Sequence, residues 1–362
     1  MPAIAFIDIS GSPFQAGQAL GRFGASAVRD HLLHTDAWRS VMRWRGTEQA
    51  ALMAAQVQAR FPRIWDELKG LADGLGLPLE DTFLWNCRGD VWAMSPDGCT
   101  TVQVPGAHRR RISHNEDGDP GFSGHCAIAQ CHIAGSPGFA SFVYPGSLPG
   151  HTFAATELGL AMTVNNLRYR NTTAGVPRMV LTRAVLDAPD LDKALAVLRD
   201  NPHAGGFHLT LGHCRSTALL SVEFSAYGCS VLDITQTSMH ANHAIHPQMR
   251  DHPQIVTGSS GHRQMRGDTV IADAARDGRE IDPLELLADT AHPSFPIYRD
   301  DPHDSDGENT QATADMRVGP TCIEWEVYEQ PGTAPRYRMI NGHTREEDAT
   351  DAGARPDVQS RH

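Results

Sequence analysis

The chain has 362 residues, of which 40% are hydrophobic and 20% are charged, and its formal net charge is −12. This composition is typical of a globular protein with one large domain or two modest ones. The acidic balance argues against nucleic acid or an anionic membrane as a partner, and no apolar run approaches the roughly 18 residues that a membrane span needs.

Residues 1–98 are predicted to be mostly helical after an opening strand. The N-terminus lacks a basic segment and carries Asp8, which favours a strand over a secretory signal. Ser12 and Pro13 are typical of a helix start. Gly17 and Gly21 lie four residues apart on that helix, so we expect another backbone to approach it closely. Further helices are predicted over residues 48–60, 62–75 and 78–86.

From residue 99 the chain changes to short β-prone runs separated by Gly and Pro. Strands are predicted over residues 100–104, 111–114, 126–133, 140–144, 151–155, 159–165, 207–214, 218–225, 229–235, 238–240, 321–328 and 336–340. Helices are predicted over residues 182–186, 191–198 and 261–274, a polar surface loop over 298–315, and a polar, disordered tail from 344. This order predicts an α+β protein in which two stacked sheets lie between helices.

One of the seven cysteines stands out by its neighbours. Their odd number and scattered positions favour reduced thiols in a cytoplasmic protein. Cys99, however, follows Gly98 and precedes Thr100 and Thr101 at the start of a β-prone run. This pattern is typical of a nucleophile that becomes a new N-terminus when the chain cleaves itself, because glycine leaves the attacked carbonyl accessible. The alternative is an ordinary buried cysteine in a strand.

Two further polar groups follow predicted strands. His114-Asn115-Glu116-Asp117 is compatible with a polar loop at a strand end. Asn165 and Asn166 end an apolar run, where their amides either donate to an oxyanion or form a turn.

Three histidines, His240, His243 and His246, raise the hypothesis of a zinc-dependent hydrolase. Pro247 and the preceding β-prone run argue against the helix that this spacing suits, and no further zinc motif accompanies the histidines. A binding protein that never cleaves itself is the second alternative.

The order of these groups resembles the acyl-coenzyme A:6-aminopenicillanic acid acyltransferase family of N-terminal nucleophile hydrolases. The similarity runs over residues 12–245. It includes the Glu67-Leu68-Lys69-Gly70 region of the helix at 62–75, Asn86-Cys87-Arg88, and the processing motif Gly98-Cys99-Thr100-Thr101. The resemblance implies a four-layer αββα sandwich, cleavage between Gly98 and Cys99, and Cys99 as the nucleophile.

The same resemblance assigns the supporting residues. Asn115-x-Asp117 matches a family motif in which the aspartate helps to orient the cysteine amino group. Asn242-His243 matches another motif, which makes Asn242 the amide of the oxyanion hole. Arg317 is the candidate for a late arginine near the nucleophile. Thr100, Thr101, Asn115, Asn165 and Asn166 are the expected supporting or oxyanion residues.

These matches imply a self-processing cysteine amidohydrolase that cleaves a small N-acyl amide through an acyl-thioester on Cys99. Hydrolysis is favoured over acyl transfer, and an acyl-coenzyme A-dependent N-acyltransferase stays open as an alternative. Glu116 stands where the penicillin enzyme is expected to carry an aromatic residue, which suggests an amine-bearing acyl group such as a β-alanyl amide.

The expected organisation follows from the cleavage site. Residues 1–98 form a helical pro-segment that stays associated as a small subunit, residues 99–343 form the catalytic part, and 344–362 form the tail. The expected partner is a small-molecule amide or thioester, and the interpretation requires no cofactor and no metal.

Overall fold

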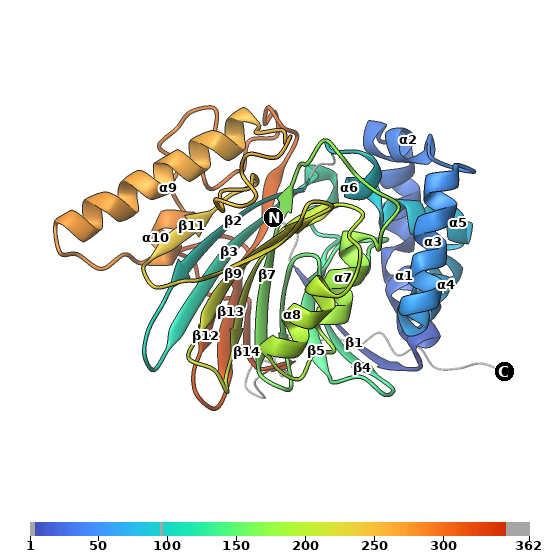
Figure 1. Cartoon of the computed structure of the whole chain (residues 1–362), viewed down its shortest axis with the longest axis horizontal. Coiled ribbons are helices and arrows are strands. Elements are labelled where there is room, and N and C mark those ends of the chain that lie inside the picture. The colour runs from blue at the N-terminus through green and yellow to red at the C-terminus, as the bar shows by residue number, and fades with distance from the viewer. Residues whose placement is uncertain (1–3, 95–96, 345–362) are drawn as a thin grey trace.

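Two stacked β-sheets form the centre of the computed structural model, which describes residues 4–94 and 97–344 (Figure 1). Within these residues, eight strands form the first sheet, in the spatial order β1 (Ala5–Gly11), β4 (Ala127–Ile133), β5 (Phe139–Val143), β6 (Phe153–Thr156), β7 (Leu160–Leu167), β8 (Gly206–His213), β9 (Leu219–Ser225) and β10 (Gly228–Asp233). Seven described strands form the second, in the order β11 (Ser238–His240), β2 (Asp97–Val104), β3 (Arg110–Gly118), β12 (Asn309–Val318), β13 (Ile323–Tyr328), β14 (Tyr337–Ile340) and β15 (His343–Thr344). Neighbouring strands are antiparallel, except that β1 runs parallel to β4.

Helices cover the outer faces of both sheets. Those that precede β2 are α1 (Pro13–Asp30), α2 (Asp36–Met42), α3 (Glu48–Arg60), α4 (Pro62–Leu75), α5 (Leu79–Trp85) and α6 (Arg88–Val91). Those that follow it are α7 (Arg178–Val185), α8 (Leu191–Arg199), α9 (Gly258–Arg276) and α10 (Pro283–Leu287). Helix α1 contacts β1 and β4, and α8 contacts β8 and β10, whereas α9 and α10 contact β11, β2 and β3. The predicted α+β, four-layer αββα architecture is therefore confirmed.

Local sequence signals account for the N-terminal helices. Ser12 caps α1 through a reciprocal capping box with Gln15, and Pro13 occupies the first turn. The bounds of α3 and α4 are those predicted. A Cβ atom on Gly17 would lie 1.9 Å from the carbonyl oxygen of Glu67, so α1 and α4 approach each other more closely than any side chain would allow.

The predicted loop over residues 298–315 is wrong in its second half. Strand β12 begins at Asn309 and lies between β3 and β13 inside the second sheet. Its buried face is made by small or unbranched side chains, among them Ala312, Ala314 and Met316, which lack the strong β-propensity of Val or Ile. Likewise, residues 114–117 lie inside β3 and not in a loop at its end. The predicted tail lies, after Thr344, outside the described residues.

The space between the sheets is apolar at one end and polar at the other. Phe153 of β6 meets Trp325 of β13 across this space, with ring centroids 6.2 Å apart. Strands β2 and β7 also face each other, but there Thr101 meets Thr163 and Asn165. The polar end is where Cys99 lies.

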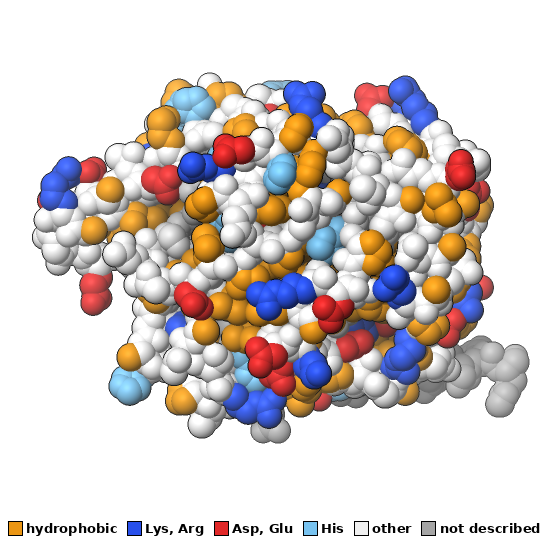
Figure 2. All heavy atoms as spheres, in the orientation of Figure 1, with side chains coloured by type: hydrophobic (Ala, Val, Ile, Leu, Met, Phe, Trp, Pro, Cys, Tyr) orange, Lys and Arg blue, Asp and Glu red, His pale blue; other side chains and the backbone are white. Residues whose placement is uncertain are grey.

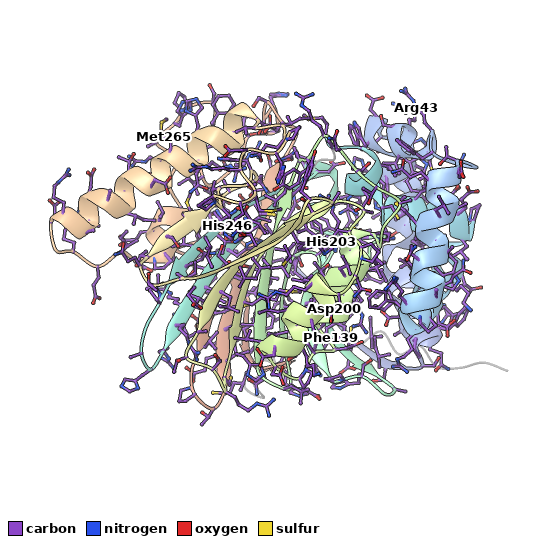
Figure 3. The ribbon with its side chains drawn as sticks, in the orientation of Figure 1. Arg43, Phe139, Asp200, His203, His246 and Met265 are labelled. Carbon is purple, nitrogen blue, oxygen red and sulfur yellow. The ribbon has the colours of Figure 1, made fainter. Side chains whose placement is uncertain are left out.

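The outer surface mixes charges of both signs. On the face drawn in Figure 2, Lys and Arg side chains alternate with Asp and Glu. In Figure 3, Met265 projects from α9 and is 59% exposed, whereas His246 lies deep in the molecule and is 2% exposed. No helix within the described residues is long and apolar enough to cross a membrane.

Candidate active site

Cys99 is held by contacts to both its backbone and its side chain. It is 3% exposed and pairs with Glu116 across the β2–β3 ladder. Its backbone nitrogen, which is the amide of the Gly98–Cys99 peptide bond in this continuous chain, donates to Oδ1 of Asn242 at 2.9 Å. Its thiol lies 3.7 Å from Oε2 of Glu116.

Arg263 of α9 joins the groups around this cysteine. One guanidinium nitrogen, Nη1, donates to the Cys99 carbonyl oxygen at 2.6 Å and to Thr100 Oγ1 at 2.7 Å. The other, Nη2, donates to Asn242 Oδ1 at 2.6 Å. Burial lowers the pKa of Arg263, and Asp117 nearby opposes this effect. The predicted helix over 261–274 contains this residue, but no motif in the sequence marks it.

Arg317, the arginine predicted from the sequence, is not brought to Cys99. It pairs with Asp315 at 2.8 Å and with Glu326 at 3.2 Å, and its side chain is 31% exposed. On β12 it lies opposite Arg111, whereas Glu116, the partner of Cys99, lies opposite Ala312. Arg263 therefore occupies the place that the sequence analysis assigned to Arg317.

Asn242 does contact the cysteine, through its oxygen. Its Nδ2, the group that an oxyanion would need, donates to the carbonyl oxygen of Asn166 at 3.3 Å. The backbone nitrogen of Asn242 donates to Ser260 Oγ at 2.9 Å, which fixes the residue against the start of α9. Asn242 thus lies where the resemblance implies, with its amide nitrogen on a long hydrogen bond.

Asp117 lies beside Gly98 and not on the cysteine nitrogen. Its Oδ1 accepts from Thr310 Oγ1 at 2.7 Å, and its Oδ2 has no hydrogen-bond partner among the described residues. Burial raises the pKa of Asp117, while Arg299 and Arg263 act in the opposite direction. Among the described contacts, Asn242 holds the nitrogen that Asp117 was expected to orient.

Gly98 has no room for a side chain. A Cβ atom there would lie 2.2 Å from Oε2 of Glu308. Glu308 is buried and is held by Arg168 at 3.0 Å and Arg299 at 2.6 Å, so it cannot easily move away. The glycine before the cysteine is thus required by packing.

A hydrogen-bonded chain leads from the thiol into the space between the sheets. Glu116 Oε2 lies 3.1 Å from His114 Nε2, and His114 Nδ1 lies 2.8 Å from Thr101 Oγ1. Thr101 donates to Asn165 Oδ1 at 2.7 Å. The sequence analysis named Thr101 and Asn165 but assigned no role to His114, because only the register of β2 on β3 brings these residues together.

The other predicted supporting residues have structural contacts. Asn115 donates to the Leu287 carbonyl oxygen at 2.9 Å and accepts from Thr313 at 2.7 Å, which ties α10 to the second sheet. Asn166 accepts a hydrogen bond from Arg178.

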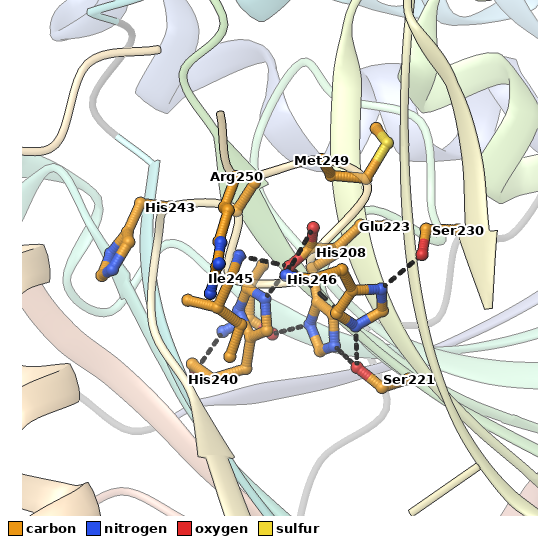
Figure 4. Close-up of polar contacts among 12 residues, drawn as sticks. His208, Ser221, Glu223, Ser230, His240, His243, Ile245, His246, Met249 and Arg250 are labelled. Atoms are coloured by element: carbon orange, nitrogen blue, oxygen red, sulfur yellow. Dashed lines mark hydrogen bonds and ion pairs between the residues drawn. The ribbon is translucent and has the colours of Figure 1, made fainter. Parts of the chain in front are cut away.

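The three histidines of the zinc hypothesis divide between two partners, Glu223 for His240 and His246 and Ser260 for His243 (Figure 4). His240 Nε2 lies 2.9 Å from Glu223 Oε1, and the His240 and His246 ring centroids are 6.5 Å apart. His243 Nδ1 lies 2.8 Å from Ser260 Oγ. The structure therefore does not gather these three rings around one point.

Ligand atoms that could reach one metal ion occur in two other groups of the described residues: Cys99, His114 and Glu116; and His132, Glu157 and His343. The first group contains the candidate nucleophile.

Comparisons with known proteins show what the chain is similar to. The sequence model described as acyl-coenzyme A:6-aminopenicillanic acid acyl-transferase matches residues 106–330. Among curated proteins, the beta-alanyl-dopamine/carcinine hydrolase of Drosophila melanogaster is 24% identical over 224 residues. That alignment covers 55% of this chain and 58% of the Drosophila protein, so the chain spans less than two thirds of this relative. Among solved structures, a variant of the conjugated bile acid hydrolase from Clostridium perfringens aligns with a TM-score of 0.42 and 12% identity, over 67% of this chain and 91% of that chain.

Proposed function

The chain belongs to the acyl-coenzyme A:6-aminopenicillanic acid acyltransferase family of N-terminal nucleophile enzymes, which act on amides other than peptides, and from this premise we propose that it is a self-processing cysteine amidohydrolase. It cleaves its own bond between Gly98 and Cys99. It then hydrolyses a small N-acyl amide through an acyl-thioester on Cys99.

The observation that carries this proposal is the set of contacts that converge on Cys99. Asn242 accepts from its nitrogen, Arg263 donates to its carbonyl oxygen, and Glu116 lies beside its thiol. The thiol contact alone does not distinguish Cys99, because the Cys126 thiol lies 3.6 Å from the carbonyl oxygen of Phe122. What distinguishes Cys99 is that the side chains of Asn242 and Arg263 bind its backbone nitrogen and oxygen. The match to the family model begins at residue 106 and does not include Cys99. The support for Cys99 as the nucleophile is therefore this set of contacts.

The mechanism has two stages. In the first, the thiol attacks the Gly98 carbonyl carbon, the acyl group passes from nitrogen to sulfur, and water hydrolyses the thioester. In the second, the freed amino group of Cys99 has an ordinary pKa of about 8 and takes the thiol proton, so the cysteine supplies its own base. Asn242 holds that nitrogen, and its Nδ2 is the donor available for the oxyanion once it leaves Asn166.

Residues 1–98 and 99–343 are proposed to stay together after cleavage, as small and large subunits. Strand β1 pairs with β4 from Ala5 to Gly11, so a strand of the small subunit completes a sheet of the large one. Helix α1 packs on the same two strands. A cytoplasmic location is part of this proposal.

Denaturing electrophoresis with N-terminal sequencing tests the cleavage. We expect two fragments, the larger of which begins at Cys99, that elute together on gel filtration without denaturant. Cys99→Ala should stay intact and inactive. An active preparation with an unbroken Gly98–Cys99 bond would contradict the proposal.

The proposed substrate is an amide whose acyl group carries an amine. The scissile Gly98 marks where an acyl group lies, and beside it Asp117 offers an oxygen that has no hydrogen-bond partner among the described residues. The Drosophila relative, whose name gives β-alanyl-dopamine and carcinine as substrates, directs the choice of amides. We expect faster amine release from β-alanyl amides than from the matching propionyl amides.

Amide formation from an acyl-coenzyme A and a free amine would instead favour the acyltransferase alternative.

A further inference from the structure

The self-cleavage proposed above requires a base other than the α-amino group. Before cleavage the nitrogen of Cys99 is a peptide amide that donates its hydrogen to Asn242, so it cannot take the thiol proton. Glu116 is in contact with the sulfur, at 3.7 Å. This inference rests on the proposed function and concerns its first stage.

The hydrogen bonds around His114 define which of its nitrogens carries a hydrogen. Asn165 Nδ2 donates to the His240 carbonyl oxygen at 3.1 Å, which orients the amide and makes Oδ1 an acceptor. The single hydrogen of the Thr101 hydroxyl points to that Oδ1, at 2.7 Å. His114 Nδ1, 2.8 Å from the same hydroxyl oxygen, must therefore be the donor in their contact.

This assignment leaves the lone pair of His114 Nε2 directed at Glu116. Two acceptors do not rest 3.1 Å apart without a hydrogen between them, so a proton lies in the contact between Nε2 and Oε2. Glu116 is 2% exposed and His114 is 0% exposed, so the two buried groups share this proton away from solvent.

We propose that Glu116 and His114 form a proton relay that serves self-cleavage. As the Cys99 sulfur attacks the Gly98 carbonyl carbon, its proton passes to Oε2 of Glu116, and the proton that Glu116 shares with His114 moves onto Nε2. When the carbon–nitrogen bond breaks, the relay runs backwards and delivers one proton to the leaving nitrogen of Cys99. Water then hydrolyses the thioester and restores the thiol, so no external oxidant, reductant or cofactor is consumed.

Self-cleavage needs the relay, whereas turnover by the mature enzyme does not. Once the bond is broken, the amino group of Cys99 supplies the base, and turnover no longer needs the relay. Loss of the relay should therefore slow maturation much more than it slows the mature enzyme. A merely structural role for Glu116 would affect both alike.

Glu116→Gln is the sharpest variant because a glutamine amide keeps a hydrogen directed at His114 Nε2 but cannot pass it on. We expect a folded precursor with a melting temperature close to that of the wild type. Self-cleavage should be slower by roughly 10²-fold or more, the usual contribution of general acid–base catalysis. Turnover per cleaved molecule should fall much less than the rate of self-cleavage does.

Two further variants complete the experiment. His114→Gln removes the terminal acceptor and should give the same separation of the two rates, which covers the case in which Glu116→Gln does not fold. Thr163→Val changes a buried hydroxyl 3.4 Å from Thr101, outside the relay, and should cleave at the wild-type rate.

The outcomes distinguish the relay from the proposed function. If a folded Glu116→Gln precursor cleaves as fast as the wild type, the relay is wrong and self-processing stands. If cleavage and mature turnover fall equally, Glu116 does not have the stage-specific role. A stoichiometric metal ion in the purified precursor, whose removal speeds cleavage, would overturn the relay in favour of a metal site. If the wild type itself never cleaves, the proposed function fails first.

Discussion

Buried charges of both signs surround the Gly98–Cys99 bond at the scale of single residues. Arg263 contacts Cys99 directly, and Glu308 lies against Gly98. Arg299 binds Glu308 at 2.6 Å and opposes the burial that raises the pKa of Asp117. A buried charge needs a partner of opposite sign. When that partner is removed, the remaining charge is still buried, and its desolvation is no longer compensated. Each of these side chains therefore constrains the position of the others.

Arg263→Gln should abolish most of the activity. It removes the guanidinium that joins the carbonyl oxygen of Cys99 to Asn242, the proposed oxyanion donor. If Asn242 loses its position, the effect should approach the loss of that donor, about 10²–10³-fold in turnover. Turnover of a standard amide by the purified, folded variant measures this effect.

Arg317→Gln is the matched control. Arg317 is 31% exposed, and its buried partner Asp315 is also bound by Arg111 at 2.6 Å, so Asp315 keeps a cation when Arg317 is removed. Its activity should stay near that of the wild type. Equal losses in both variants would contradict the assignment of Arg263 to the site.

Gly98→Ala should slow self-cleavage and destabilise the precursor. The new methyl group would lie 2.2 Å from a carboxylate oxygen of Glu308 that two arginines hold in place. Overpacking of this kind costs roughly 1–3 kcal/mol, and it also displaces the carbonyl group that the thiol must attack. The rate at which the two fragments appear, together with the melting temperature, tests both effects. A variant that cleaves and melts like the wild type would contradict the packing argument.

At the scale of elements, the sequence predicted helices better than strands. Helices α3 and α4 begin and end where predicted, because caps, glycines and 3.6-residue periodicity are local signals. The sequence analysis missed strand β12 over Asn309–Asp315. This segment is held as a strand by pairing with β3 and β13 on either side, and its small buried side chains carry little local strand signal. The candidate nucleophile was proposed from its neighbours in the chain. Arg263, on a helix far along the chain, could not be, because tertiary packing alone brings it to Cys99.

Gly70→Ala should destabilise the packing of α4 on α1. A Cβ atom at this position would lie 1.9 Å from the carbonyl oxygen of Phe14, and a backbone atom cannot rotate away as a side chain does. We expect the free energy of unfolding to fall by about 1–3 kcal/mol or more. Chemical denaturation of Gly70→Ala in the uncleaved Cys99→Ala protein measures this change.

Gly261→Ala provides the comparison within a helix. Its Cβ atom would meet only Val256 Cγ1, at 3.7 Å, which is an ordinary contact. Alanine is the better helix former by about 1 kcal/mol, so this variant should be as stable as the parent or slightly more so. A Gly70→Ala protein as stable as Gly261→Ala would show that α1 and α4 can separate without cost.

At the scale of the whole molecule, a buried polar network continues from the site to the far edge of the first sheet. His208 Nδ1 lies 3.1 Å from Asn165 Oδ1, and its Nε2 lies 2.8 Å from Ser221 Oγ. Ser221 Oγ lies 2.9 Å from His246 Nε2, and His246 Nδ1 lies 3.0 Å from Ser230 Oγ on β10 (Figure 4). His246, one of the three histidines that suggested zinc from the sequence, therefore belongs to this buried network.

Protonation of this network should destabilise the fold. Burial lowers the pKa of His246 to about 4, although Glu223 acts in the opposite direction, so the ring is neutral in the folded protein. An unfolded histidine has a pKa of about 6.5 and binds its proton at a higher pH. The contribution of His246 to stability is therefore fully present above about pH 6.5 and falls until about pH 4, by up to about 1.4 kcal/mol for each pH unit.

A pair of variants isolates this contribution. Burial raises the pKa of Asp90 to about 7, which gives stability the opposite slope over the same range, so the pH dependence of one protein alone is not decisive. We would compare the free energy of unfolding of Cys99→Ala with that of Cys99→Ala/His246→Gln between pH 7.5 and 4.5. The parent should lose more stability than the double variant as the pH falls, because glutamine takes up no proton. If the two curves stay parallel, His246 is not held neutral by the network.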